Sequence, residues 1–393
     1  MTDHERAPMR ITYVIDSLVG GGAETSLAAL APHYIARGIE LDVVYLKDRP
    51  GLQGQLEEAG ARLFCVAGPG GRAGNIGRIV AHLRAHRSDL VHTTLFEADV
   101  AGRVAARLTR VPVVSSLVNV QYGPEHYGAP HIRYARLRGA QLLDATTARA
   151  TARLHALTGH VADVMAQRLS LKRERIDVVP RGRDATALGV RSTRRASRIR
   201  SALGLADATP VVVAAARQEY QKGLDVALEA WPAVSRTLPD AVLLIAGREG
   251  NHTAELRTSS VAGSDSVRWL GPRGDVPELL AAANAFVLPS RWEGLGSVLI
   301  EAMALEAPMV ASDLPPVREV VGDCAALFAP GDPAALAAAL TGTLKNPARS
   351  ADLAGRARAR FETRFTIETV ADQMVNFYET ALGRRSTVSA EAS

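Results

Sequence analysis

The sequence predicts an α/β protein built from two doubly wound parallel sheets, with helices on both faces of each sheet. Three observations lead to this fold class. Short runs of β-branched residues alternate with alanine-rich amphipathic stretches, which is the pattern of repeated strand–helix units. The chain has 393 residues, enough for two or three domains at roughly 150 residues each. An arginine-rich segment with few bulky apolar residues separates two blocks of such units, so we expect a basic linker at residues 186–208.

The first block, residues 1–185, contains short apolar runs that end in polar or glycine-rich turns. Their length and β-branched content predict strands at residues 11–15, 41–46, 63–66, 90–93, 113–117, 153–157 and 176–179. Amphipathic stretches fill the gaps and predict helices, for example at residues 24–37 and 98–108.

The second block, residues 209–366, repeats the pattern. We expect strands at residues 211–216, 242–246, 267–270, 285–288, 309–312 and 326–328. A helix at 333–344, a polar turn at 345–347 and a last helix at 367–382 follow. The polar tail 383–393 is expected to be disordered.

The composition excludes several classes of protein. Hydrophobic residues make up 47% and charged residues 22%, which indicates a globular chain rather than a disordered one. The net charge of +5 is too small for a dedicated nucleic-acid binder, so we expect no nucleic-acid partner. Cys65 and Cys324 are far apart and lack Cys or His neighbours at metal-ligand spacing. We therefore expect neither a disulfide framework nor a metal site.

No targeting or membrane segment is visible. The first residues carry charges of both signs, and the apolar run that follows is interrupted by Asp16, unlike a signal peptide. No stretch approaches the roughly 18 uninterrupted apolar residues of a membrane span. We expect a cytoplasmic protein. Arginines among leucines in residues 131–153 leave two interpretations open: a solvated helix, which we favour, or peripheral contact with anionic lipid at the inner face of a membrane.

A glycine-rich turn, residues 19–25, follows the first expected strand and opens a helix. Gly21 and Gly22 would let backbone N–H groups approach a phosphate or a sugar. A dinucleotide (NAD(P)) site needs a third glycine where this chain has Thr25, and an acidic residue where the second strand ends in Lys47. A plain tight turn without a ligand is the other alternative.

Two further sites follow strands of the second block. Arg217 and Lys222 come after its first strand, where ligands of doubly wound sheets bind, and they could hold a diphosphate. Glu293 precedes a helix that we expect to begin near Ser297, and Glu301 falls on the second turn of that helix. Backbone donors at the helix N-terminus would lie between the two carboxylates, a layout that matches a ligand with phosphates between hydroxyl-bearing ends. An exposed helical carboxylate is the structural alternative for Glu301.

These motifs resemble the retaining nucleotide-sugar glycosyltransferases of the GT-B fold, specifically family 4 (glycosyl transferases group 1). Glu293 and Glu301 are separated by seven residues, which is the hallmark of that family, and the sequence EGLGSVLIEAMA around them is similar to the family's usual wording. The glycine turn, the Arg217/Lys222 pair and residues 177–184, 245–247 and 311–313 match in the same order. The resemblance covers nearly the whole chain and implies two Rossmann-like domains facing a cleft, with the helix at 367–382 packing back on the first.

The resemblance implies that the first domain binds the acceptor and the second binds a nucleoside-diphosphate sugar. Arg217, Lys222 and Glu293 would be catalytic, with Glu293 on the donor-sugar hydroxyls and Glu301 on the ribose hydroxyls. The full donor-binding set would be Gly21, Gly22, Arg217, Lys222, Glu293, Gly294, Leu295, Gly296, Ser297 and Glu301. The chain has no Asp-x-Asp motif, so we expect transfer without a metal and without a cofactor. As the nucleotide we favour UDP over GDP. The acceptor would be a glycan, a lipid-linked molecule or a small molecule.

One departure from the family concerns the segment after the strand at 113–117. Many relatives carry a histidine there that positions the donor sugar, whereas this chain has Val118. Asn119, His126 and His92 are candidates for acceptor binding or positioning, although His92 is equally explained as a structural histidine at a strand end. The departure leaves open a second function class, a noncatalytic GT-B homologue that acts as a partner or activator protein.

Overall fold

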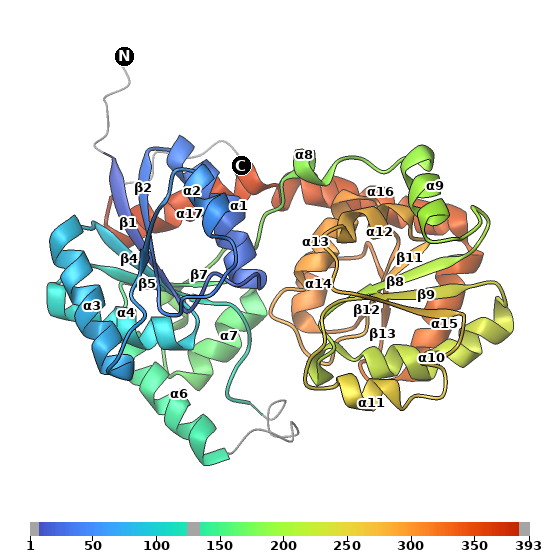
Figure 1. Ribbon diagram of the computed structural model, residues 1–393, viewed down its shortest axis with the longest axis horizontal. Helices are drawn as coiled ribbons and strands as arrows, with labels where there is room; N and C mark the ends of the chain where they lie inside the picture. The colour runs from blue at the N-terminus through green and yellow to red at the C-terminus, as the bar shows by residue number, and fades with distance from the viewer. Residues whose placement is uncertain (1–7, 124–133, 385–393) are drawn as a thin grey trace. The chain divides into compact units, whose positions relative to one another are not determined.

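The computed structural model describes residues 8–123 and 134–384 (Figure 1). The chain divides into two compact units, of which the first comprises Met1–Gly182 with Ile367–Ser393 and the second Arg183–Thr366. Each unit is a parallel sheet flanked by helices, so the predicted fold class is confirmed. Every expected strand is present, and no strand end is shifted by more than two residues.

Within the described residues, the first unit holds a seven-stranded sheet in the order β3-β2-β1-β4-β5-β6-β7. Its strands are β1 (Met9–Ile15), β2 (Ile39–Tyr45), β3 (Arg62–Cys65), β4 (Leu90–Thr94), β5 (Val113–Leu117), β6 (Arg153–Ala156) and β7 (Ile176–Val178). Its helices are α1 (Gly22–Ala36), α2 (Gln53–Glu58), α3 (Gly71–His86), α4 (Phe96–Thr109), α6 (Tyr134–Ala148), α7 (Gly159–Arg168) and α17 (Ile367–Ala381), with a short 3-10 turn η1 (Arg173–Arg175).

Side chains alternate between the two faces of this sheet, as the two-residue period of a strand requires. On β1, Ile11, Tyr13 and Ile15 join one apolar core together with α1, α2 and α17. Val14 joins a separate core that α3 and α4 cover on the opposite face. Both faces are buried, which explains why β1 is apolar at five of its seven positions.

The last helix, α17, packs against α1 in the first unit (Figure 1). Ile367, Val370, Ala371 and Met374 recur at three- and four-residue spacing and enter the core beside α1. The Nε of Arg37, the C-cap residue of α1, lies 2.6 Å from Oδ1 of Asp372 and adds an ion pair to α17. The polar tail that begins at residue 383 lies outside the described residues from residue 385 on.

Within the described residues, the second unit holds a six-stranded sheet in the order β10-β9-β8-β11-β12-β13. Its strands are β8 (Val211–Ala215), β9 (Val242–Ala246), β10 (Val267–Gly271), β11 (Ala285–Leu288), β12 (Met309–Ser312) and β13 (Ala326–Phe328). Its helical elements are α8 (Ala185–Leu188), α9 (Thr193–Ala202), η2 (Tyr220–Lys222), α10 (Leu224–Thr237), α11 (Thr253–Arg257), α12 (Val276–Ala282), α13 (Ser297–Ala304), α14 (Pro315–Val321), α15 (Pro333–Lys345) and α16 (Pro347–Arg364). Apolar residues of α10 and α15 share one core with the central strands.

The segment expected to be a linker, residues 186–208, instead forms part of the second unit, and the first domain ends at Gly182 rather than at 185. Helix α9 packs against α12, where Arg195 binds Glu278 at 2.7 Å. Arg200 is buried and donates to the carbonyl of Ala282 at 2.8 Å and to Oδ1 of Asn284 at 2.7 Å. The expectation was wrong because these arginines bury their guanidinium groups against protein acceptors, whereas composition alone suggested a solvated segment.

The basic stretch at 131–153 is also not one helix. Helix α6 ends at Ala148, and Arg153 lies in β6, where its Nη2 donates to Oδ1 of Asp177 at 2.8 Å. Of the residues that the structure describes, no helix combines the length and apolar character needed to cross a membrane.

Candidate functional site

Two loops meet at the carboxyl ends of β8 and β11, which pair side by side in the second sheet. Lys222 ends the short turn η2 after β8, and Glu293 lies in the loop between β11 and α13. The Nζ of Lys222 donates to Oε1 of Glu293 at 2.6 Å, and the Oγ of Ser290 donates to the same oxygen at 2.7 Å. Glu293 is only 5% exposed, so this is a buried anion held by two donors.

Gly223 allows the two loops to come this close. Its φ is +62°, and a Cβ atom at this position would lie 2.0 Å from the carbonyl oxygen of Pro289. Only glycine fits, both because of the left-handed backbone and because of the contact. A backbone hydrogen bond then joins the loops, from the N–H of Arg291 to the carbonyl of Gln221 at 2.8 Å. The position of Lys222 against Glu293 therefore depends on its glycine neighbour.

Arg291 fastens the same loops from the other side, a role that the sequence analysis missed. Its guanidinium donates to Oδ1 of Asp225 at 2.8 Å and lies 4.1 Å from the ring centroid of Tyr220. Burial raises the pKa of Asp225, but the hydrogen bonds and the charge of Arg291 outweigh it and hold that pKa below its usual value. Asp225 is thus an anion that keeps Arg291 and the turn at residues 220–222 in place.

Helix α13 begins at Ser297, as predicted, and its N-cap residue Gly296 has φ +77°. Glycine offers no side-chain cap to the first turn, which leaves the positive end of the helix next to Glu293 without a capping side chain. Leu295 is 2% exposed and packs in the core, so only its backbone can serve a ligand. Gly294 is also buried, and as a glycine it can contact a ligand only through its backbone.

Glu301 lies on the second turn of α13 and has a partner that the sequence analysis placed at the domain boundary. The Nε of Arg183 donates to Oε1 of Glu301 at 2.7 Å, and the two side chains are 13% and 17% exposed. Glu301 is therefore not an exposed carboxylate on the helix surface, which was the alternative interpretation of its sequence position. The sequence could have indicated Arg183, since it belongs to the 177–184 motif. It could not indicate the partner, because Glu301 is more than a hundred residues away.

Arg217 lies apart from this pair in its contacts. Its guanidinium binds Glu219, two residues along the chain, and its side chain is 43% exposed. The loop that carries it approaches the end of β9 closely, because a Cβ at Gly247 would lie 1.8 Å from the carbonyl of Ala216. The structure therefore brings together Lys222 and Glu293 from the predicted set and leaves Arg217 paired locally.

In the first unit, the glycine turn opens α1 with Gly21 as its N-cap. A Cβ at Gly22 would lie 2.4 Å from Nη1 of Arg181, and a Cβ at Gly21 would lie 2.5 Å from Oε2 of Glu24. These contacts are with the ends of flexible side chains that can move, so they do not by themselves require glycine at either position. Arg181, which the sequence analysis did not single out, brings a positive charge to the N-terminal end of α1.

His92 is a structural histidine in the first unit. It is 1% exposed, and its Nδ1 and Nε2 lie 2.7 Å from the hydroxyls of Tyr378 and Ser116 respectively. The hydroxyl of Ser116 also forms a hydrogen bond with Nδ1 of His155 at 2.8 Å, and Nε2 of His155 donates to the carbonyl of Val179 at 2.7 Å. This buried row of hydrogen bonds ties α17 to β4, β5 and β6.

The direction of each hydrogen bond in this row follows from its last acceptor, the carbonyl of Val179. The Val179 carbonyl only accepts, so His155 carries its proton on Nε2 and accepts from Ser116 on Nδ1. Ser116 then accepts from Nε2 of His92, and Nδ1 of His92 accepts from Tyr378. Burial lowers the pKa of His155 to about 4 and that of His92 well below its usual value. Both rings are held neutral.

The remaining positioning candidates have different outcomes. Val118 lines a small cavity of about 40 Å³ together with His92 and Ser116. The Oδ1 of Asn119 accepts a hydrogen bond from the N–H of Val120 at 2.9 Å, so that side chain caps its own loop. His126 lies outside the described residues.

Comparison with protein families divides the chain as the structure does. Residues 20–187 match the model described as Glycosyltransferase Family 4, and residues 196–360 match the model Glycosyl transferases group 1. Each match falls within one of the two units, except for a few residues at the boundary.

Individual relatives extend this likeness. The chain is 30% identical over 330 residues to a D-inositol 3-phosphate glycosyltransferase of Xylanimonas cellulosilytica, covering 78% of this chain and 76% of that protein. It is 31% identical over 211 residues to a GDP-mannose-dependent phosphatidylinositol monomannoside mannosyltransferase of Corynebacterium glutamicum, covering 51% of this chain and 55% of the relative. The chain spans about half the length of this relative and of two other curated mannosyltransferases that it matches.

Among solved structures, HepE of Anabaena in complex with UDP and glucose superposes with a TM-score of 0.82 at 25% identity, covering 95% of this chain and all of that one. WaaG, a glycosyltransferase involved in lipopolysaccharide biosynthesis, superposes with a TM-score of 0.71 at 18% identity, over 93% and 99% of the two chains. The second likeness concerns the fold alone. With one relative matched over most of both lengths and both family models matched in order, this chain belongs to the family 4 glycosyltransferases of the GT-B fold.

Proposed function

We propose that the protein transfers a sugar, with retention of anomeric configuration, from a nucleoside-diphosphate sugar to an acceptor hydroxyl, and that it does so without a metal ion. The observation that carries this proposal is the buried Lys222–Glu293 pair beside the N-terminal end of α13. A cation, an anion and a helix N-terminus converge there at the carboxyl edge of a parallel sheet, where ligands of this fold class bind.

The chemistry of the leaving group supports this assignment. When a nucleoside diphosphate departs, negative charge grows on its phosphate oxygens. Lys222 and the positive end of α13 are preorganised donors in a partly buried place, and such donors stabilise developing charge without reorganising. Arg217, which is half-exposed and bound to Glu219, would exchange that partner for the diphosphate. These charges supply what a bridging metal ion supplies elsewhere.

Glu293 suits sugar binding better than nucleophilic attack. Both of its hydrogen bonds go to Oε1, and among the described residues no donor is recorded for Oε2. One oxygen is thus fixed by the protein and the other is available to sugar hydroxyls, which is the division expected of a positioning carboxylate. Retention would then follow front-face attack by the acceptor, as the family resemblance implies.

Glu301 with Arg183 would hold the ribose. A carboxylate fixed through Oε1 by a guanidinium keeps its second oxygen for a pair of hydroxyls. We favour UDP as the nucleotide, since HepE is described in complex with UDP and resembles this chain over 95% of its length. The GDP-mannose-dependent relative is the reason to test GDP beside it.

For the acceptor we propose a glycan, a lipid-linked molecule or a small molecule bound by the first unit. Helix α6 favours the lipid-linked class, because Tyr134 and Leu142 are 61% and 71% exposed. Arg138 is exposed between them at four-residue spacing, which makes one apolar and basic stripe suited to an anionic lipid surface. Co-sedimentation with anionic against neutral vesicles tests this contact, and Leu142→Glu should reduce it.

The direct test is donor turnover by the purified protein. UDP-sugars and GDP-sugars are supplied with and without acceptors, and released nucleoside diphosphate and product anomer are measured. Val118, at the place of the family's histidine, favours the alternative of a noncatalytic partner protein. That alternative predicts nucleotide binding by calorimetry with no turnover of any donor. Turnover with an inverted product would contradict the retaining mechanism.

A further inference from the structure

A buried carboxylate on β2 is not explained by the transfer site. Side chains alternate along this strand, so Leu41 and Val43 enter the core under α1, whereas Val44 enters the core under α3 and α4. Asp42 points to the same face as Val44 and is 0% exposed. A buried carboxylate is costly unless it is paired or binds a metal.

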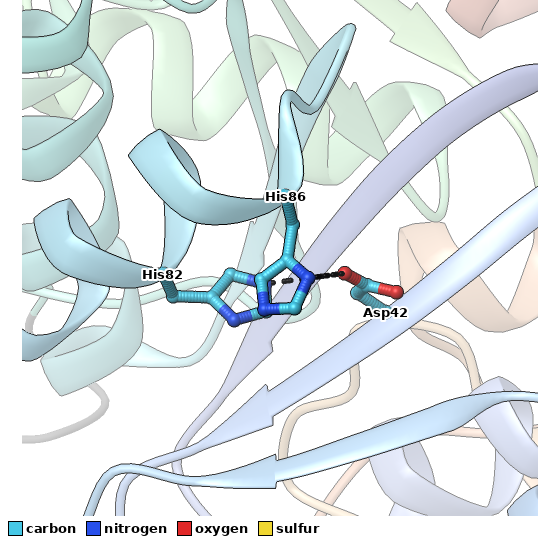
Figure 2. A group of neighbouring side chains, drawn as sticks. All are labelled: Asp42, His82 and His86. Atoms are coloured by element: carbon cyan, nitrogen blue, oxygen red, sulfur yellow. Dashed lines mark ion pairs between the residues drawn. The ribbon is translucent and has the colours of Figure 1, made fainter.

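Only half of this carboxylate is satisfied by hydrogen bonds. The Nε of Arg62, on the neighbouring strand β3, donates to Oδ1 of Asp42 at 2.7 Å. The other oxygen, Oδ2, makes no hydrogen bond. It faces two imidazoles from α3, with Nε2 of His82 at 3.3 Å and Nδ1 of His86 at 3.9 Å (Figure 2).

The imidazoles present a second orphaned atom. His82 and His86 are four residues apart, so they share one face of α3, and their rings stack with centroids 4.2 Å apart. Nε2 of His82 is buried and has no hydrogen-bond partner. These two neighbouring buried atoms lie 3.3 Å apart as an ion pair without the geometry of a hydrogen bond, and both are strong metal ligands.

The spacing fits a metal ion. One ligand atom from each of Asp42, His82 and His86 lies within 4.8 Å of the other two. Ligands at about 2.0–2.2 Å from a tetrahedral Zn²⁺ lie about 3.3–3.6 Å from one another. The observed distances of 3.3 Å and 3.9 Å from Oδ2 lie at or close to that range.

Surrounding residues hold the three ligands in place. Arg62 fixes the carboxylate through the oxygen that would not bind the metal. Phe64 packs against both imidazoles, with ring centroids 4.5 Å from His82 and 4.8 Å from His86. Arg10 donates to the carbonyl of His86 at 2.8 Å, which fixes the last turn of α3. Metal ligands in proteins are typically oriented by such outer contacts.

We propose that Asp42, His82 and His86 bind a divalent transition-metal ion, with Zn²⁺ as the best match. Two imidazoles and one carboxylate suit Zn²⁺ and its neighbours rather than Mg²⁺ or Ca²⁺, which prefer oxygen ligands throughout. Three protein ligands leave one coordination position for water. The ion would pin α3 to β2 in the first unit, whereas Lys222 and Glu293 belong to the second. The proposal is therefore independent of the proposed sugar transfer.

The sequence predicts no metal site, because Cys65 and Cys324 are isolated and no Asp-x-Asp motif is present. The two histidines alone are a common helical pattern, and the carboxylate comes from a strand forty residues earlier. The sheet order, with β2 between β1 and β3 and α3 over that face, brings the three together.

The test uses the full chain without an affinity tag, freed of metal with a chelator and then desalted. Titration with Zn²⁺ should show one ion bound per chain and a higher thermal midpoint, and Co²⁺ should give the absorption of a tetrahedral site. His86→Ala and Asp42→Asn should each weaken Zn²⁺ binding by at least about 10- to 100-fold, the loss typical of disturbing only the outer contacts of a site. His33→Ala, a histidine of α1 in the same unit, is the matched control and should bind as the wild type does.

His86 is the more exposed of the two histidines, so its alanine variant should keep the metal-free midpoint of the wild type and serves if Asp42→Asn does not fold. No Zn²⁺ binding by the folded wild type would overturn the proposal and leave Asp42, His82 and His86 as a cluster of ion pairs. Equal loss in His33→Ala, or full affinity in His86→Ala, would overturn it as well.

Discussion

The Nζ of Lys222 lies 2.6 Å from Oε1 of Glu293, although 71 residues separate them in the chain. The contact exists because β8 pairs directly with β11, so the loops that follow these strands leave the same edge of the sheet side by side. It joins the cation proposed to bind the diphosphate to the carboxylate proposed to bind the sugar. A ligand spanning both groups would be bound by a preorganised pair.

Lys222→Ala should lower transfer by roughly 100- to 1,000-fold, the loss typical of removing one preorganised donor from a transition state. Because Glu293 is left with Ser290 as its donor, the variant should also unfold at a lower denaturant concentration than the wild type. Steady-state rates and urea unfolding measure the two effects. Arg236→Ala, which removes an exposed cation from α10, is the control and should change neither. A wild-type rate in Lys222→Ala would remove this residue from the mechanism.

Gly223→Ala should reduce transfer although it adds only a methyl group. The Cβ would lie 2.0 Å from the carbonyl of Pro289 at a φ of +62°, so the two loops must separate and Lys222 must leave Glu293. Gly204→Ala is the matched control, because Gly204 has a similar φ of +64° with no atom within 4 Å of its Cβ. Both variants carry the strain of a left-handed alanine, and only the first should lose activity. Equal activity in the two would mean that the loop contact is unimportant.

The two family glutamates should fail in different ways. Glu301→Ala should weaken binding of the bare nucleoside diphosphate, which contains the ribose, by about 1.5–3 kcal/mol, or roughly ten- to a hundredfold. Glu293→Ala should leave that affinity nearly unchanged and depress transfer from the sugar nucleotide, because its partner hydroxyls belong to the sugar. Calorimetry with UDP and GDP measures the first effect, and donor turnover measures the second.

Glu229→Ala, an exposed carboxylate on α10, is the control for both glutamates and should behave as the wild type. If both glutamate variants lose nucleotide affinity equally, Glu293 contacts the nucleotide rather than the sugar. That outcome would change the site assignment without changing the reaction class.

Acid should destabilise the first unit through its buried histidines. Burial lowers the pKa of His155 to about 4, whereas the unfolded chain has an ordinary value of about 6.5. Between these values the unfolded state binds more protons than the folded state. The contribution of neutral His155 to the free energy of unfolding is therefore complete above about pH 6.5 and is lost as the pH falls towards 4. His155→Gln keeps a donor and an acceptor but cannot take up a proton.

The free energy of unfolding of the wild type should therefore fall more steeply with acid than that of His155→Gln, by about 1.4 kcal/mol per pH unit in this range. Urea unfolding of both proteins across the range gives the two slopes. Parallel slopes would show that His155 is already protonated in the folded protein.

Chelation should leave transfer unchanged. In the proposed mechanism Lys222, Arg217 and the N-terminal end of α13 meet the diphosphate charge, so EDTA should remove nothing that the reaction needs. The assay is run well below the thermal midpoint, since loss of an ion from the cluster of Asp42, His82 and His86 would lower that midpoint without touching the second unit. Activity lost with EDTA and restored by Mg²⁺ or Mn²⁺ would indicate a donor site bridged by a metal ion.

Much of the fold could be predicted from local patterns. Buried parallel strands are short, apolar and β-branched, so their positions were visible to within two residues. The start of the helix that carries Glu301 was equally local, because Gly296 ends the loop that contains Glu293 and Ser297 begins the helix. Helix α16 (Pro347–Arg364) was missed, since its many arginines and few apolar residues resemble a solvated connection.

The partners of these residues could not be predicted in the same way. Lys222 with Glu293, Arg183 with Glu301, Tyr378 with His92, and Asp42 with His82 all join segments that are distant in sequence. Each pair depends on which strands lie side by side and on which face of the sheet a helix covers. A sequence pattern records the period of one segment and whether it is buried, but not the neighbour that buries it. The order of strands in a parallel sheet supplies that neighbour, because crossover connections bring non-consecutive strands together and all their carboxyl ends to one edge.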